Sequence, residues 1–305
     1  STNGWIPIED DTVTDAPVKL NTEGIFGFGH DASAVTAVTN LVSNVGVVAT
    51  DVTGVGTARQ YIAACEYGND KGIFGFGAAA GDALVDETNL VSNAGVVASD
   101  VTGVGTARKG LGACGYGGDK GIFAFGAAGS VTAVSNLVSN AGVVATDTTG
   151  VGTARYGLAA THYGGDKGIF GYGGEHVSIT NLVSNAGVVA TDTTGVGTIR
   201  ARLAACGYST DKGIFGYGKD GSGMLSMTNL ISNAGVVATD TTGVGTAREN
   251  SAACEYGEDK GIFGFGDNDV VKYSMTNLVS NAGVVASDVT GVGTDRGGLA
   301  ACSFN

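Results

Sequence analysis

Cysteine provides the most reactive side chains in this chain, and all five cysteines recur at one position of a repeated segment. They are Cys65, Cys114, Cys206, Cys254 and Cys302, and Thr161 takes the sixth equivalent position. An odd number of cysteines, one per repeat, argues against a disulfide framework. A six-membered ring of thiols also matches no zinc-ligand spacing. We therefore expect free thiols that pack as small apolar groups between repeats.

Histidine and carboxylate side chains could support metal binding or acid–base chemistry, but their spacing favours neither. The chain has three histidines, of which His30 and His176 stand beside acids in variable segments without a metal-ligand spacing. Propeller hydrolases such as sialidases and lactonases need unique catalytic groups, whereas nearly identical repeats duplicate theirs. Glu175 is a single odd acid that leaves a glycoside hydrolase or lactonase open as an alternative. We expect no catalytic residue, no metal site and no cofactor.

The repeated charges are better explained as framework than as a ring around a ligand. Repeat positions carry as many acids as bases, so the net charge of −13 belongs to the other positions. We expect the framework charges to cap turns and to form ion pairs between repeats. They are Arg59, Arg108, Arg155, Arg200, Arg248 and Arg296; Asp51, Asp100, Asp147, Asp192, Asp240 and Asp288; and Asp-Lys pairs that begin at Asp70, Asp119, Asp166, Asp211 and Asp259.

A repeat of about 47 residues positions all these side chains, since G-I-F-G-F-G or a close variant begins at residues 24, 72, 121, 168, 213 and 261. Each unit contains four strand-like segments: a (L-A-A-C-x-Y), b (K-G-I-F-G-F/Y-G), c (T-N-L-V-S-N) and d (G-V-V-A-T-D). Glycine, asparagine and aspartate turn signals separate them. Four short strands in a unit of this length are typical of a propeller blade. The sequence predicts an all-β, six-bladed propeller of four-stranded antiparallel blades.

The order of segments at the two ends predicts that the ring is closed. Segment a starts at the arginines, so repeat boundaries lie near residues 59, 108, 155, 200, 248 and 296. The first unit begins near Thr22 without a segment a, and an unaccompanied segment a spans 299–304. We expect this last strand to complete the N-terminal blade, within a propeller of residues 22–305. An open solenoid would instead need distinct polar caps.

These arginine-led, glycine-rich units resemble kelch-type repeats. The departures are a single glycine, such as Gly77, in place of a Gly-Gly pair, and Trp5 as the only tryptophan. The nearly identical units, with T-N-L-V-S-N-A-G-V-V-A-T-D-T-T-G-V-G-T, are also similar to repeat proteins of phage and environmental bacteria. That resemblance implies a tail-associated or adhesive module at a virion surface or outside the cell.

Two segments vary between repeats: the pair after each arginine (the d–a link) and the b–c link. Strands alternate in direction, so both links should lie on one face, and the a–b and c–d turns on the opposite face. Variable loops on a constant framework are the layout of a recognition surface, on which tyrosines stack on sugars or fill protein pockets. Minor variation also occurs in the a–b turns, at Glu66, His162 and Glu255. The candidate ligand-binding residues are Gln60, Tyr61, Lys109, Tyr156, Arg202, Glu249 and Asn250 after the arginines, and His30, Asp31, Asp82, Asp86, Glu175, His176, Lys219, Asp220, Asp267, Asn268 and Tyr273 in the b–c links.

Composition narrows the range of partners. A net charge of −13 repels phosphate, so we expect no nucleic acid. No apolar run approaches the roughly 18 residues that a membrane span needs, so we expect no membrane insertion. Residues 1–21 hold both prolines and the acidic run Glu9-Asp10-Asp11, and suggest an extended arm that joins a larger assembly.

The function expected from these features is non-catalytic recognition or adhesion. The partner would be a cell-surface glycan or protein receptor, and the location extracellular or on a virion surface. A structural or decoration module of a larger assembly is the alternative.

Overall fold

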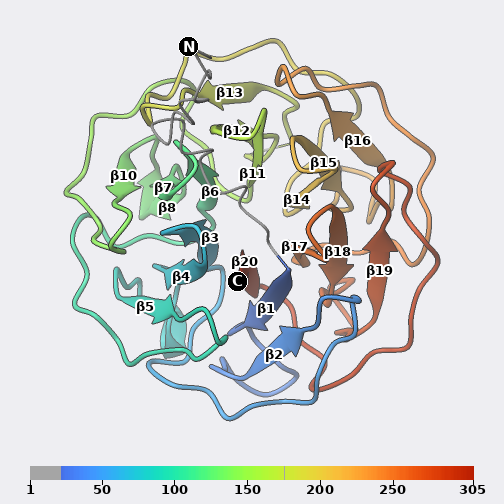
Figure 1. Cartoon of the computed structure of the whole chain (residues 1–305), viewed down its shortest axis with the longest axis horizontal. Coiled ribbons are helices and arrows are strands. Elements are labelled where there is room, and N and C mark those ends of the chain that lie inside the picture. Colours follow the sequence, from blue (N-terminus) through green and yellow to red (C-terminus); the bar gives the residue numbers. More distant parts are fainter. Residues whose placement is uncertain (1–21, 175) are drawn as a thin grey trace, which may run out of the picture.

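A computed structural model describes residues 22–174 and 176–305, in which six three-stranded antiparallel sheets surround a common centre (Figure 1). The inner strands are β3 (Ala63–Tyr67), β6 (Gly112–Tyr116), β11 (Ala159–Tyr163), β14 (Ala204–Tyr208), β17 (Ala252–Tyr256) and β20 (Ala300–Phe304). The middle strands are β1 (Glu23–Gly27), β4 (Lys71–Gly75), β7 (Lys120–Ala124), β12 (Lys167–Gly171), β15 (Lys212–Gly216) and β18 (Lys260–Gly264). The outer strands are β2 (Thr39–Val42), β5 (Thr88–Val91), β10 (Ser135–Val138), β13 (Thr180–Val183), β16 (Thr228–Ile231) and β19 (Thr276–Val279).

Two b–c links contain regular structure of their own. One holds the 3₁₀ helix η1 (Ala80–Asp82), and another holds a small hairpin of β8 (Ala127–Ala128) and β9 (Ser130–Val131). No helix in the described part of the chain is long and apolar enough to cross a membrane. The arm expected at 1–21 lies outside the described residues.

Segments a, b and c are the strands that the sequence predicts, but segment d does not form a fourth strand. It pairs with the outer strand only at isolated bridges, Thr39 with Val52 and Val42 with Val48 in the first sheet. Between these bridges the Asn40 side chain donates to the Ala49 carbonyl at 3.0 Å. A side chain therefore takes the place of a backbone donor and interrupts the ladder.

The last inner strand lies in the first sheet. β20 pairs with β1 in antiparallel register, from Glu23 opposite Phe304 to Gly27 opposite Ala300. The C-terminal segment a thus occupies the place that the order of segments predicted for it.

Aromatic residues of the middle strands pack between neighbouring sheets, as their repeat positions predict. Phe28 meets Phe74 with ring centroids 5.2 Å apart, and the corresponding contacts continue from sheet to sheet until Phe265 meets Phe26 at 5.1 Å. Edge-to-face pairs of this kind stabilise beyond the area they bury. The series therefore passes through all six sheets and returns to the first.

The repeated arginines are buried structural groups. Arg155 donates to the carbonyls of Tyr172 and Thr153 at 2.7 and 3.1 Å and to Asn181 Oδ1 at 2.7 Å. Its guanidinium also lies 4.3 Å from the Phe125 ring of the preceding sheet. Asp192 accepts from the Thr153 hydroxyl at 2.6 Å. Thr153 precedes the sheet of β11, β12 and β13, and Asp192 follows its outer strand β13. We call this Thr–Asp hydrogen bond the clasp, and it fastens the incoming link to its own sheet. The expected ion pairs between two sheets are therefore not what these charges form.

All five cysteines are free and buried, as predicted. Their sulfur atoms lie against middle-strand glycines of an adjoining sheet; a Cβ on Gly24, for example, would overlap Cys254 Sγ. Glycine in segment b and a small side chain in segment a therefore fit one another.

Candidate functional site

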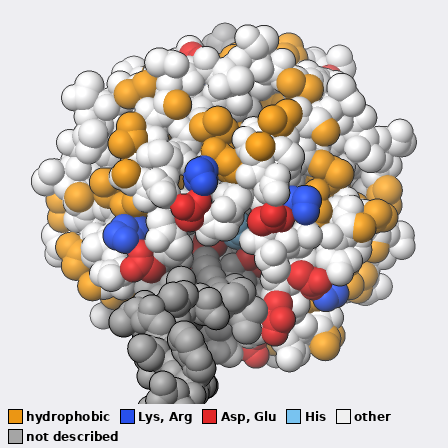
Figure 2. Space-filling view, turned by 45° about the horizontal axis from the view of Figure 1, so that its top comes forward, with side chains coloured by type: hydrophobic (Ala, Val, Ile, Leu, Met, Phe, Trp, Pro, Cys, Tyr) orange, Lys and Arg blue, Asp and Glu red, His pale blue; other side chains and the backbone are white. Residues whose placement is uncertain are grey.

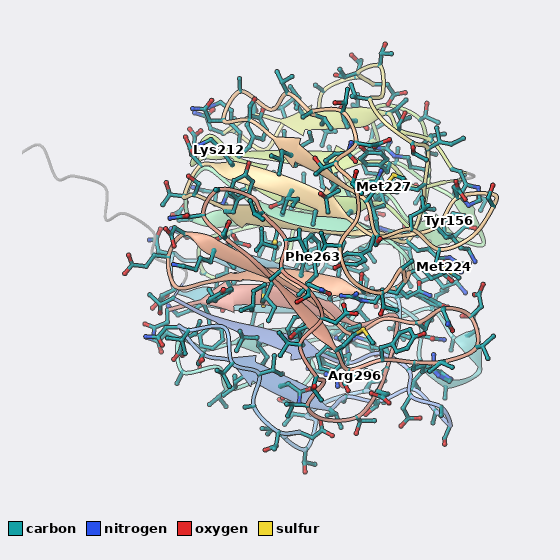
Figure 3. All side chains as sticks on the ribbon, turned by 90° about the vertical axis from the view of Figure 1, so that its right-hand side faces the viewer. Tyr156, Lys212, Met224, Met227, Phe263 and Arg296 are labelled. Atoms are coloured by element: carbon teal, nitrogen blue, oxygen red, sulfur yellow. The ribbon has the colours of Figure 1, made fainter. Side chains whose placement is uncertain are left out.

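The two variable links lie at one end of the molecule, which we call the cavity face. The opposite end, the turn face, carries the a–b and c–d turns. Figure 3 shows Tyr156 of a d–a link and Met224 of a b–c link at the cavity face, with Lys212 at the other end. Isolated bridges join the two kinds of link, for example Lys109 with Ala127 and Glu249 with Asp267. The predicted convergence of these links is confirmed; their role in recognition stays a prediction.

A collar of six backbone hydrogen bonds encircles the axis at this face. The N–H of Gly110 donates to the Tyr61 carbonyl at 2.8 Å, and the Tyr61 N–H donates to the Gly298 carbonyl at 2.7 Å. The remaining bonds run through Gly157, Arg202 and Asn250 at 2.6 to 2.9 Å, so the series returns to its start. All six residues have φ between 53° and 65°, which explains glycine at three of them and shows that Tyr61 and Arg202 are held in a conformation uncommon for such side chains.

A cavity of about 410 Å³ lies on the axis beside this collar. Its lining combines aromatic, charged and apolar groups: Tyr61, Lys109, Tyr156, Arg202 and Asn250 from the variable pairs, and Ile62, Leu111, Leu158, Leu203, Ser251 and Leu299 from the next position of each repeat. Ser251 is the exception in that second set, because the other five repeats carry leucine or isoleucine there. It is 8% exposed, and its hydroxyl has no hydrogen-bond partner among the described residues.

A charge network adjoins one side of the cavity. Glu249 Oε1 lies 3.0 Å from Arg202 and 3.2 Å from Lys219, while the Glu249 side chain is fully buried. Burial raises the pKa of this carboxyl, although Arg202 and Lys219 act in the opposite direction. Asn250 donates to Asp267 at 3.2 Å. The ion pair with Glu249 therefore holds Arg202 at the cavity wall.

The lining offers hydrogen-bond donors and aromatic rings rather than reactive groups. Lys109 is ion-paired with Asp82 and lies 5.9 Å from the centre of the Tyr61 ring. Burial raises the pKa of the Tyr61 hydroxyl, so it is a neutral donor at physiological pH. Paired cations, tyrosine rings and apolar side chains therefore make up the cavity wall.

Several other predicted site residues hold loops in shape. Asp31 accepts from the backbone of Ser33 and Ala34 at 2.7 and 2.8 Å, and Asp220 accepts from its own loop in the same way. Asn268 donates to the Tyr273 hydroxyl at 2.7 Å.

The remaining candidates do not line the cavity either. Gln60 is bridged to Ala78, and His30 to Val35 and Gly297. His176 has a positive φ of 64°, and Asp86 packs against Gly103. Glu175 lies outside the described residues.

Sequence reasoning missed Ser251 and did not separate Asp269 from the other loop acids, although Asp269 pairs with Lys219 at 3.3 Å. A comparison of the six repeats at the position before segment a would have found Ser251, because the residue departs from an otherwise apolar set.

The turn face carries Asp-Lys pairs, so that acidic and basic side chains alternate around its centre (Figure 2). A second polar cluster lies on the axis toward this face. There His162 lies between two carboxylates, with Nδ1 3.2 Å from Glu66 and Nε2 2.8 Å from Glu255. Burial opposes protonation of the imidazole, but the two carboxylates outweigh it and raise the pKa of His162 to about 10. In the sequence these three residues stand out only as minor variation.

The chain matches no known protein-family model and no curated protein sequence.

Proposed function

We propose that this protein is a non-catalytic recognition domain that binds a cell-surface glycan in the axial cavity of the cavity face. The observation that carries the proposal is the identity of the lining. The cavity is lined by the residue pair after each arginine, which is one of the two segments that vary between otherwise nearly constant repeats. Its volume of about 410 Å³ is in the range of small-ligand sites.

The chemistry of the lining favours a sugar. Tyr61 and Tyr156 offer aromatic faces and hydroxyls, which suit the apolar face and the polar edge of a pyranose ring. Ser251 adds a buried hydroxyl without a partner among the described residues. This oxygen is covered in the structure, so a ligand would reach it once the serine side chain rotates toward the cavity, and pairing it would then be favourable because leaving it unpaired is costly.

The charges favour a neutral sugar over an acidic one. Both cations of the lining already have carboxylate partners, Lys109 in Asp82 and Arg202 in Glu249. The local charge is thus close to balanced, and an additional carboxylate or sulfate on the ligand would compete with these pairs.

The fold and the resemblance of the repeats support the proposed setting. We take the six sheets to be the blades of a closed propeller of kelch-like type, in which segment d serves as an irregular outer element. Such a ring presents its loops at one end, which suits an extracellular or virion-surface module joined to a larger assembly through residues 1–21.

A glycan array tests this proposal with the full chain. Tyr156→Ala should weaken binding of the best neutral glycan by about tenfold, as expected from the loss of a stacked ring. Lys212→Ala, at the opposite end, should bind like the wild type (Figure 3). Equal binding by both variants, or a preference for acidic glycans that Tyr156→Ala leaves intact, would exclude the cavity as the site.

A further inference from the structure

The cluster on the axis has a regular arrangement that the proposed function does not use. Glu66, His162 and Glu255 come from β3, β11 and β17, which are every second inner strand around the centre. The intervening strands carry Gly115, Gly207 and Ser303 at the same position. Two residues earlier, all six repeats carry alanine, so the variation is confined to one level of the axis.

The three side chains are held close together and are largely shielded from solvent. They are 13%, 14% and 8% exposed, in chain order. One ligand atom from each, a histidine nitrogen and two carboxylate oxygens, lies within 4.8 Å of the other two. Each imidazole nitrogen faces a different carboxylate, so an ion bound to one nitrogen requires the carboxylate at the other nitrogen to turn toward it. Within a cluster of this size, such a turn would allow nitrogen and oxygen to reach the distance of about 2.0–2.2 Å at which they bind zinc.

The glycines between them make room for this cluster. A Cβ on Gly207 would overlap the carboxylate of Glu255 and would lie 2.8 Å from His162 Cε1. A Cβ on Gly115 would lie 3.5 Å from the carboxylate of Glu66. Glycine at position 207 is therefore a steric requirement of the cluster, whereas a Cβ at position 115 would make only ordinary contact and the third intervening position carries Ser303.

Two small cavities adjoin the cluster, and they offer space for an ion and a water molecule. Cavities of about 30 and 40 Å³ are each lined by all three side chains, and each matches the volume of about one water molecule. The larger one leads toward the turn face, where Asp166 and Glu258 contribute to its lining. Acidic groups there would attract a cation toward the axis.

We propose that Glu66, His162 and Glu255 bind one divalent transition-metal ion of the Zn²⁺ type on the axis. The donor set selects this class, because imidazole with carboxylates suits zinc and its neighbours, whereas calcium and magnesium take oxygen ligands. The ion would displace the proton that the imidazole otherwise holds, and two carboxylates with the neutral imidazole would then balance its charge. The bound ion would join three sheets that are not neighbours and would act as a structural pin, with water in a fourth position.

Metal titration of the full chain tests this site. After treatment with a chelator, the wild type should take up one equivalent of Zn²⁺ in competition with a chromophoric chelator, and Zn²⁺ should raise its melting temperature. Glu66→Gln, His162→Gln and Glu255→Gln should each weaken binding by more than about 100-fold, since even outer-shell partners change metal affinity about 10–100-fold. The matched control is His30→Gln, which removes a histidine of the cavity face and should leave binding unchanged.

Co²⁺ provides a readout that does not depend on any variant. Bound at this site of the wild-type chain, it should show the visible absorption of a low-coordinate nitrogen–oxygen complex, and Zn²⁺ should displace it. Absence of stoichiometric binding would overturn the proposal and leave a protonated imidazole between two carboxylates. Binding that persists in all three variants would overturn it as well, because the ion would then occupy another site.

Discussion

Phe304 provides a sharp test of how the last strand holds the ring together. It is 1% exposed and packs with Ile25, Phe28 and Phe74 of two neighbouring sheets. Its ring also supports the c–d turn of the second sheet, since a Cβ on Gly95 would lie 2.8 Å from Phe304 Cζ. Phe304→Ala removes these contacts and leaves the backbone pairing of β20 with β1 intact.

The structure implies a large effect. Truncation of a buried phenylalanine costs about 3–5 kcal/mol. A loss of that size lowers the melting temperature by roughly 6–20 °C, at the roughly 2–4 °C per kcal/mol that applies to domains of about 150–250 residues. Deletion of 301–305 removes the strand itself and should approach the entire stability of a domain, about 5–15 kcal/mol.

Thermal and urea denaturation followed by circular dichroism measure both changes. The matched reference is Tyr116→Ala, which truncates the equivalent residue of β6. Tyr116 is 5% exposed, and β6 lies far from either end of the chain. If β20 is as firmly held as β6, the two variants lose similar stability. A loss for Phe304→Ala below about a third of that for Tyr116→Ala would show that the chain end is frayed and that the ring does not depend on it.

Three further predictions concern the framework. Arg155→Met should lower the free energy of unfolding by about 3 kcal/mol or more in urea titrations, because it leaves the Asn181 oxygen and two carbonyls without their donor, at about 1–3 kcal/mol for each; a loss below about 1 kcal/mol would contradict this. Burial acts to raise the pKa of Asp192 and its five equivalents, but threonine and asparagine hydrogen bonds lower each one below 3.8. The stability that these carboxylates add is therefore complete above pH 3.8 and is lost as the pH falls through their lowered pKa values. The melting temperature should stay level from about pH 7 to 5 and drop below about pH 4. Absence of that drop would count against the Thr–Asp clasps. The five thiols should react with a thiol reagent only after unfolding, and fast labelling of the native chain would show that they are not buried.

The repeat made much of this fold predictable. Identical spacing located segments a, b and c, because aromatic and β-branched residues between turn signals leave few other arrangements. Alternation of strand direction placed both variable links at one end. Segment d was not predictable in the same way, since its valine-rich stretch has strand propensity, but the Asn40 side chain and its equivalents take over ladder bonds.

The site was less accessible to sequence reasoning. The sequence showed that Tyr61 and Tyr156 occupy positions that differ between repeats, but only the collar geometry brings both to one cavity. Glu66, His162 and Glu255 are separated by intervening repeats, and their meeting on the axis follows from the ring rather than from local spacing. Asp31 and Asp220 have the composition of binding residues, whereas their carboxylates cap their own loops.

Equilibrium binding of the best neutral array glycan to Ser251→Leu is the decisive test of recognition in the axial cavity. This change introduces the residue that four other repeats carry at the same position, so it should leave the melting temperature equal or higher. It also fills part of the cavity and removes the unpartnered hydroxyl. We expect affinity to fall by at least about tenfold while stability is kept. Unchanged affinity in a well-folded Ser251→Leu chain would show that the axial cavity is not where this protein recognises its partner.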